Sequence, residues 1–123
     1  KEKICEFNLK NKVRLLGFYN QMDELYCGAD LLIMPSLFEG LPLSGVEAQM
    51  TGLPCVFSTS ITDELAITEI AEFVDLNEDN SVWANKMNLI LKLSINRSEY
   101  CKLVVQAGYS YNSTLDQLEK ILQ

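Results

Sequence analysis

The chain has 123 residues, 48% of them hydrophobic and 22% charged, which fits one small globular domain rather than a disordered segment. Its 10 basic and 17 acidic residues give a formal net charge of −7, so binding to nucleic acid or to an anionic membrane surface is disfavoured. The sequence contains no histidine, which excludes a Ser-His-Asp hydrolase and removes the usual zinc ligand.

Short apolar runs alternate with helical segments over the first two thirds of the chain, and this alternation predicts parallel strand–helix–strand units. The apolar run 31–34 is closed by Pro35 and is typical of a strand that is buried on both faces. Asn20 is expected to cap the preceding helix, with Asp23 at its positive end. The expected strands are 13–17, 31–34, 55–57 and 73–75, and the expected helices are 20–29 and 44–50.

The last third of the chain is predicted to be helical, because apolar residues recur there at helical spacing in three successive segments. These residues are Trp83, Met87, Ile90 and Leu91, then Tyr100, Leu103, Val104 and Ala107, then Leu115, Leu118 and Ile121 or Leu122. Two further helix starts are indicated by the capping pairs Asn96 with Glu99 and Ser113 with Asp116.

The four cysteines are widely spaced and form no CxxC pair, so neither a zinc centre nor a redox centre is expected from them. No apolar run approaches the roughly 20 residues of a transmembrane helix. The start of the chain has no signal-peptide pattern. We therefore expect a cytoplasmic protein whose thiols are reduced and buried.

Two glutamates with seven residues between them flank a predicted loop and helix start. Glu39 lies in the loop, and Glu47 lies one turn into the helix. The helix start near Leu43 and Ser44 offers unpaired N–H groups and a positive dipole end, both of which suit an anion. Carboxylates accept hydrogen bonds from sugar hydroxyls. The two features together fit a ligand with phosphates in its middle and hydroxyl-rich groups at both ends, which is the shape of a nucleotide-sugar.

This pair resembles the EX7E pattern of retaining glycosyltransferases of family 4, which have the two-domain GT-B architecture. The likeness spans most of the chain and is greatest to bacterial exopolysaccharide or capsule glycosyltransferases. It implies an α/β fold with a partial Rossmann-like parallel sheet of three or four strands, flanking helices and a helical C-terminal third. The matching residues are 13–17, 25–26, 29–30, 35–36, 38–42, 47–48, 52–56, 62–64, Phe73, Asp75 and 83–84.

The resemblance also implies roles for individual residues. Glu39 is expected to act as the catalytic residue by contacting hydroxyls of the donor sugar, and Glu47 is expected to bind the ribose hydroxyls. The donor would be a UDP- or GDP-sugar, with no metal and no cofactor. Backbone amides would hold the sugar and diphosphate along Gly40, Leu41, Pro42, Leu43 and Ser44. The base would be bordered by Gly17, Phe18 and Tyr19.

One part of the family pattern is missing from this chain. The family holds the diphosphate with an Arg and Lys pair, whereas no basic residue lies between Arg14 and Lys86, and no DxD triplet could recruit a metal instead. The matching pattern begins at what would be the third strand of the domain, and the chain begins with Lys1 rather than Met. Residues 1–123 are therefore expected to form one incomplete domain, the back part of the donor-binding domain, with the basic pair and the acceptor domain upstream.

Consequences follow for this chain and for the intact enzyme. The chain alone is expected to be inactive, to bind nucleotide-sugar weakly, and to self-associate through an uncovered edge or face of its sheet. The intact enzyme would transfer the sugar to a glycan or lipid-linked acceptor. It would be cytoplasmic, or peripheral to a membrane through its missing part.

Two other hypotheses stay open. A nucleotide-sugar epimerase or a phosphorylase would share this fold, although the run 38–40 argues mildly against both. A non-catalytic α/β interaction module is the alternative from a different class. A receiver domain does not fit, because Asp30 precedes its strand, and a dehydrogenase half would need a GxGxxG run. Convergence of Glu39 and Glu47 on one cleft at the helix start would favour the enzyme over the module.

Overall fold

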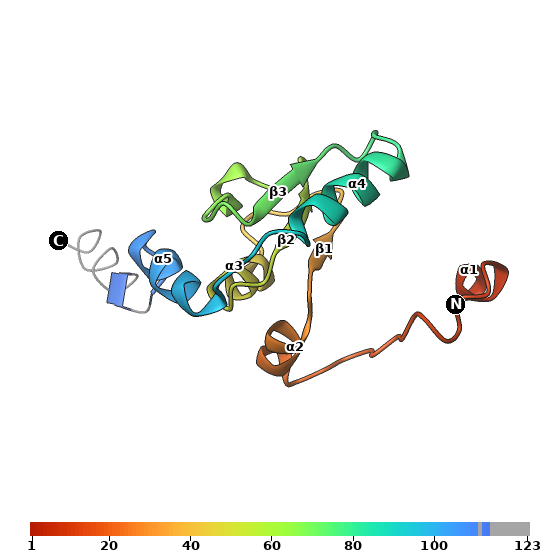
Figure 1. The fold of residues 1–123 in the computed structure, drawn as a ribbon, viewed down its shortest axis with the longest axis horizontal. Helices are drawn as coiled ribbons and strands as arrows, with labels where there is room; N and C mark the ends of the chain where they lie inside the picture. The colour runs from red at the N-terminus through yellow and green to blue at the C-terminus, as the bar shows by residue number, and fades with distance from the viewer. Residues whose placement is uncertain (111, 114–123) are drawn as a thin grey trace.

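A computed structural model describes residues 1–110 and 112–113 of the chain (Figure 1). Ile33 stands opposite Val56 in the first strand pair, and Phe57 stands opposite Phe73 in the second. Both pairs are parallel, which confirms the predicted α/β class with a Rossmann-like parallel sheet. The three strands lie in the order β1 (Leu32–Met34), β2 (Cys55–Ser58) and β3 (Ala71–Val74).

Helices cover both faces of this sheet. Side chains alternate along β2, so Phe57 faces one side of the sheet and Val56 faces the other. On the side of Phe57 the core takes in Val46 and Val104, and on the side of Val56 it takes in Ile90. These three residues belong to α3, α5 and α4 respectively (Figure 1). The α-helices are α1 (Glu2–Glu6), α2 (Met22–Gly28), α3 (Leu43–Met50), α4 (Asn80–Ile90) and α5 (Tyr100–Gln106), and the 3₁₀ helices are η1 (Asp63–Leu65) and η2 (Arg97–Glu99).

Helix α3 is fixed against the sheet by close packing and by a buried side-chain amide. A Cβ atom at Gly45 would lie 2.8 Å from Cδ2 of Leu65 and 3.2 Å from Cζ of Phe57, so the helix leaves no room for a larger residue there. The buried amide of Gln49 donates to the carbonyl of Leu65 at 2.8 Å. It also accepts from the backbone N–H and the hydroxyl of Thr68 at 3.1 and 2.8 Å. Since these polar groups are satisfied, the contact is compatible with full burial.

Helix α2 is attached to the rest of the fold by Arg97. Its guanidinium donates from Nη1 to the carbonyl of Cys27 at 2.8 Å and from Nη2 to the carbonyl of Ala29 at 2.7 Å. Positive charge is favourable at the C-terminal end of a helix, where the last carbonyls lack helical partners. The backbone of Arg97 in turn lies against Gly52, where a Cβ atom would stand 2.6 Å from Cα of Arg97. Arg97 therefore links α2 to the turn that follows α3.

The expected strand over 13–17 is not formed. These residues have no regular structure, and Val13, Leu15 and Leu16 are exposed. Figure 1 shows them in an extended segment that runs from α1, which lies apart from the sheet. The run 13–17 is expected to be the third strand of the complete domain. In the doubly wound order 3-2-1-4-5-6, the third strand pairs with the second. The described residues contain no such neighbour, so an apolar run with strand-like residues has nothing to pair with.

The strand expected over 31–34 is formed, but the prediction that both of its faces are buried is wrong. Leu32 and Met34 pack against the core on the α3 side, while Ile33 is 44% exposed. Ile33 shares the sheet face of its partner Val56, which α4 covers. That single helix covers the face at β2 and β3 and leaves it open at β1.

Smaller differences concern element ends and thiols. The N-cap of α2 lies one residue later than expected, at Gln21 rather than Asn20, and Asp23 lies in the first turn of the helix. Asn96 precedes a 3₁₀ helix and bonds the carboxylate of Glu99 at 2.7 Å. All four cysteines lie within the described residues as free thiols, but only Cys55 is buried as expected.

The expectations for Asp116 and for the final apolar stripe fall outside the described residues. Among the helices that the structure does describe, none has the length and apolar character needed to cross a bilayer.

Candidate functional site

The loop after β1 leads into α3 through Pro42, which occupies the N-cap with a φ of −72°. No side chain of the described residues caps α3, and its first turn contains no acidic residue. The N–H of Gly45 is bonded to the carbonyl of Pro42 at 3.0 Å. Neither a capping side chain nor an acidic residue in the first turn therefore neutralises the positive end of the α3 dipole, and an anion could bind there.

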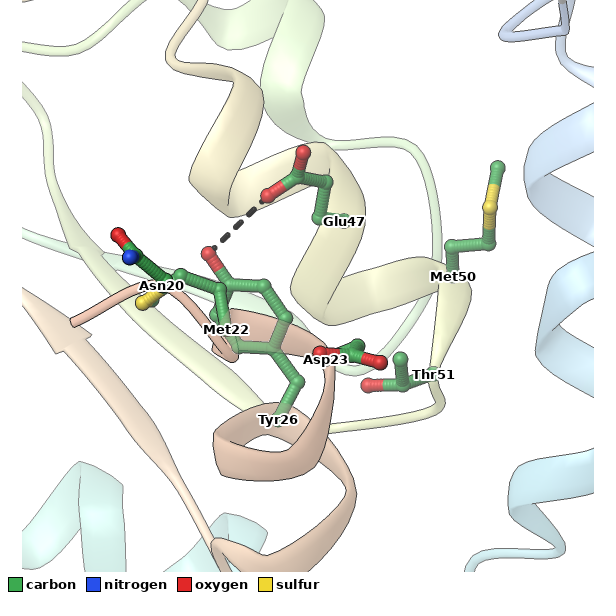
Figure 2. A pocket seen from close by; sticks show the side chains of 7 residues that line it. All are labelled: Asn20, Met22, Asp23, Tyr26, Glu47, Met50 and Thr51. Atoms are coloured by element: carbon green, nitrogen blue, oxygen red, sulfur yellow. Dashed lines mark hydrogen bonds between the residues drawn. The ribbon is translucent and has the colours of Figure 1, made fainter.

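A pocket lies between α2 and α3, and its volume of about 340 Å³ is within the range of small-molecule sites. Glu47 is its acidic group on α3, and Asp23 is its acidic group on α2. The remaining lining mixes hydroxyl, amide and thioether side chains, as Figure 2 shows. Such a surface suits a ligand that donates hydrogen bonds from hydroxyl groups and also has an apolar face. The lining residues are Asn20, Met22, Asp23, Tyr26, Glu47, Met50 and Thr51.

Tyr26 and Glu47 form the direct polar contact between the two helices. The phenol of Tyr26 donates to Oε2 of Glu47 at 3.2 Å (Figure 2). Burial raises the pKa of Tyr26 to about 12, and the negative charge of Glu47 and the hydrogen bond to it add to this effect. The phenol therefore remains protonated, and so remains a donor, throughout the physiological pH range.

Glu39 is not brought into this pocket. Its side chain is exposed, and its Oε1 accepts from the hydroxyl of Ser36 at 3.4 Å. Its backbone forms a parallel bridge with Ile61, in the segment after β2. The side chain of Glu39 thus contacts Ser36 in its own loop, whereas the side chain of Glu47 contacts Tyr26 on α2. Glu39 does not line the pocket of Glu47, so the expected convergence of the two carboxylates, which would favour an enzyme over an interaction module, is not observed. The role of Glu39 stays a prediction.

None of the three residues expected to border the base lines this pocket. Gly17 has a φ of +67° with open space around it, and the ring of Phe18 is 94% exposed. Tyr19 lines a neighbouring pocket of about 320 Å³ together with residues of α2 such as Leu25. The next residue, Asn20, is the first of this stretch to reach the pocket of Glu47. The segment Gly40 to Pro42 lies in the loop before α3, and Leu43 and Ser44 open that helix.

Sequence reasoning missed six of the seven pocket residues, although their spacing could have indicated them. Met22 and Tyr26 stand four positions apart on α2, and Glu47 on α3 stands four positions before Thr51, the C-cap of that helix, so each pair shares one helix face. The spacing does not say that these two faces meet. That information lies in the packing of α2, which Arg97 fixes from a distant part of the sequence.

Basic residues and metal-binding clusters are not part of this site in the described region. The pocket lining contains no Lys or Arg. Arg97 is engaged with α2, and Lys86 pairs with Glu72 at 3.0 Å. The described residues also include no group of three or more Cys, Asp or Glu side chains placed to hold a metal ion.

Comparison with known proteins identifies the family. The family model described as "Glycosyl transferases group 1" matches residues 1–92. A Bacillus subtilis protein named as a glycosyltransferase, EpsF, is 35% identical over 119 residues, which cover 95% of this chain and 31% of that protein. The Escherichia coli UDP-Gal:alpha-D-GlcNAc-diphosphoundecaprenol alpha-1,3-galactosyltransferase is 28% identical over an alignment of 123 positions, which covers 94% of this chain and 31% of that protein.

A third relative is the amylovoran biosynthesis glycosyltransferase AmsD of Erwinia amylovora, 22% identical over 93% of this chain and 32% of that protein. The chain thus spans about a third of the length of these relatives. No solved structure gives a significant match. The extent of the family match and the identity to its named members show that this chain belongs to the group 1 glycosyl transferase family.

Proposed function

We propose that this chain is the back part of the donor-binding domain of a retaining GT-B glycosyltransferase, and that the longer enzyme transfers a sugar from a UDP- or GDP-sugar. The observation that carries the proposal is the placement of Glu47. Its carboxylate lies in a pocket between α2 and α3, one turn beyond the uncapped start of α3. A hydroxyl-binding group and an anion-binding helix end are therefore adjacent on one element.

The spacing on α3 suits the two ends of a nucleoside diphosphate. Glu47 lies four positions after Leu43, which corresponds to about 6 Å along the helix axis. A ligand of nucleotide size could place its ribose hydroxyls on Glu47 and its phosphates at the helix start. Carboxylates are acceptors for such hydroxyls, and helix N-termini bind phosphate.

The chemical step we propose is departure of the diphosphate from the donor sugar. The bond between the anomeric carbon of the sugar and the phosphate oxygen breaks with its electron pair going to the diphosphate, where negative charge develops. A new bond forms between that carbon and the acceptor hydroxyl oxygen, and the hydroxyl proton passes to the departing diphosphate. Groups placed to stabilise that charge lower the barrier. In this chain they are the backbone amides at the start of α3, and in the longer enzyme they include the basic pair expected upstream. Glu39 would contact the hydroxyls of the donor sugar, as the EX7E resemblance implies.

No metal or cofactor is part of this proposal. The positive end of α3 and the upstream basic pair would meet the diphosphate charge instead. We expect the activity of the longer enzyme to be unchanged when EDTA is added.

The acceptor is proposed to be a glycan or a lipid-linked sugar. One relative is named for an acceptor linked to diphosphoundecaprenol, and another is named for amylovoran biosynthesis. A lipid-linked acceptor would bring the longer enzyme to the cytoplasmic face of a membrane. The matched relatives reported above are named as glycosyltransferases, which favours sugar transfer over an epimerase, a phosphorylase or an interaction module.

The test is isothermal titration of the longer protein with UDP, GDP and a UDP-sugar. We expect one of the two nucleotides to bind, which also identifies the base, and Glu47→Ala to raise its Kd by about tenfold or more, as loss of a charged hydrogen-bond acceptor predicts. Glu6→Ala is the control, because Glu6 is also an exposed acidic residue but lies in α1, outside the residues that line the pocket. Wild-type protein that binds neither nucleotide would contradict the proposal.

A further inference from the structure

We infer that Tyr26 is a positioning residue for Glu47: its hydroxyl holds one carboxylate oxygen, so that the other oxygen is presented to hydroxyl groups of the ligand in the pocket. The inference rests on the proposed function, because it takes the ribose of a nucleotide as that ligand. It adds a residue of α2 to a site whose sequence motif lies entirely in the loop and in α3.

The geometry distinguishes the two oxygens of the carboxylate. The phenol of Tyr26 lies 3.2 Å from Oε2 of Glu47, on the α2 side of the pocket (Figure 2). Glu47 itself is exposed, and the structure gives its side chain no other described hydrogen bond. An exposed glutamate on a helix samples several rotamers, and ordering it costs side-chain entropy. A hydrogen bond already made in the free protein reduces that cost on binding.

The hydrogen-bond donor, the phenol of Tyr26, is itself held rigidly. Only 5% of Tyr26 is exposed, and its ring belongs to the main core cluster together with Val46 and Cys55. The pKa of Tyr26, raised to about 12 by burial and then by Glu47, keeps the hydroxyl protonated. The contact can therefore act in one direction only, from phenol to carboxylate.

The helix that carries Tyr26 is also fixed in place. Arg97 binds the carbonyls of Cys27 and Ala29, directly after Tyr26 on the chain. Its backbone fits against Gly52, which directly follows the end of α3. The same arginine thus links α2 and α3 at one end, while the Tyr26–Glu47 hydrogen bond links them at the pocket. This double link is what a positioning role requires, because the hydroxyl must keep its place relative to α3.

The test uses Tyr26→Phe in the longer protein, with Tyr100→Phe as the matched control. Tyr100 is also buried and also donates to a carboxylate, that of Glu69 at 2.8 Å, but it lies on α5 and does not line the pocket. Titration with the nucleotide that the wild-type protein binds should show a Kd about five times higher for Tyr26→Phe and an unchanged Kd for Tyr100→Phe. In turnover, the KM for the donor should rise while kcat is little changed, because the lost contact orients ground state and transition state alike.

Two further comparisons separate positioning from a merely structural role. In a Glu47→Ala background, Tyr26→Phe should no longer change the Kd, since no carboxylate is left to position. With a 2′,3′-dideoxynucleoside diphosphate, wild type and Tyr26→Phe should bind equally, because the ligand lacks the hydroxyls that Glu47 would accept. An equal loss of affinity in the Glu47→Ala background, or an unchanged Kd in the wild-type background, would overturn the inference while leaving the proposed function standing. A wild-type protein that binds neither UDP nor GDP would overturn both.

Discussion

The two ends of the described chain differ in how completely their own residues pack. From α3 onward, core side chains such as Phe57, Leu65 and Val104 are fully buried. Before β1, the apolar side chains of Leu15, Leu16 and Phe18 are exposed, and α1 buries none of its residues. Both regions contain strand-like sequence, so the difference does not come from local preference. It comes from the neighbours: the later region contains its partner strands and covering helices, and the earlier region does not.

This contrast explains which expectations were confirmed. An isolated strand is not stable, because it gains its energy from pairing and from burial of its side chains. The apolar run 55–57 has partners on both sides and forms β2. The run 13–17 has equally suitable residues but no partner among the described residues.

The largest expected effect is a loss of stability that should distinguish two glycines, one in each region, with the same backbone conformation. Gly17 has a φ of +67° and Gly52 a φ of +68°, but only Gly52 is crowded, with Cα of Arg97 2.6 Å from where a Cβ would stand. We expect Gly52→Ala to lower the free energy of unfolding by about 2 to 4 kcal/mol, from backbone strain and overlap together. Gly17→Ala should cost about 1 kcal/mol or less.

Urea unfolding of the chain, followed by the fluorescence of its single tryptophan, measures both values. Gly28→Ala is the control, since a Cβ there meets nothing within 4 Å and the backbone is helical. Equal losses for Gly17→Ala and Gly52→Ala would show that the two regions are packed alike, which would contradict the contrast.

The sequence predicted those elements whose partners it contains. The helix over 44–50 and the strand over 55–57 agree with α3 and β2 within one residue, because apolar spacing and the Pro and Gly residues at their ends determine them locally. The strand over 13–17 failed because pairing is not local. The exposure of Ile33 was missed for the same reason: an apolar run indicates burial only where something covers it.

The candidate site was predictable to a similar degree. The pattern of Glu39 and Glu47 placed Glu47 on a helix correctly, since helix position follows from nearby residues. It could not indicate that Tyr26 would donate to Glu47, because that contact depends on how α2 packs on α3. Nor could it indicate that the side chain of Glu39 would contact Ser36, with its backbone bridged to Ile61, rather than line the pocket of Glu47. Contacts between elements are the part of the site that required the structure.

A smaller effect concerns stability at high pH, where a phenol and a thiol buried in the packed region titrate. Burial raises the pKa of Tyr100 to about 12, with the hydrogen bond and charge of Glu69 adding to the effect, and burial alone raises the pKa of the Cys55 thiol to about 12. Because these pKa values are higher in the folded chain than in the unfolded chain, the stabilisation is complete below the unfolded pKa values and is lost as the pH rises towards 12. Stability should therefore fall between about pH 9 and pH 12.

Tyr100→Phe tests this loss of stability at alkaline pH. At pH 7 it should lower the free energy of unfolding by about 1 to 2 kcal/mol, through loss of the hydrogen bond to Glu69. The difference between wild type and variant should shrink as the pH rises from 10 to 12, as the wild type loses the same contact. Urea unfolding at a series of pH values measures it. A difference that stays constant up to pH 12 would mean that Tyr100 does not titrate in this range.

The smallest expected effect lies at β1, where the two regions meet. Ile33 and Val56 are partners on neighbouring strands, but Ile33 is 44% exposed and Val56 is fully buried. Ile33→Thr should change the free energy of unfolding of this chain by less than about 0.5 kcal/mol, whereas Val56→Thr should cost about 1 to 3 kcal/mol by burying a hydroxyl. We also expect Ile33→Thr to weaken self-association of the chain in sedimentation velocity, since it removes an apolar side chain from the open face.

The same two substitutions in the longer protein compare Ile33 and Val56 more directly. If upstream residues cover β1 there, Ile33 becomes a core residue, and Ile33→Thr should then cost as much as Val56→Thr. A cost that remains below about 0.5 kcal/mol in the longer protein would mean that this face is exposed in the enzyme as well. The open face at β1 would then be a surface of the enzyme rather than the boundary of an incomplete domain, and the contrast between the two regions would need another cause.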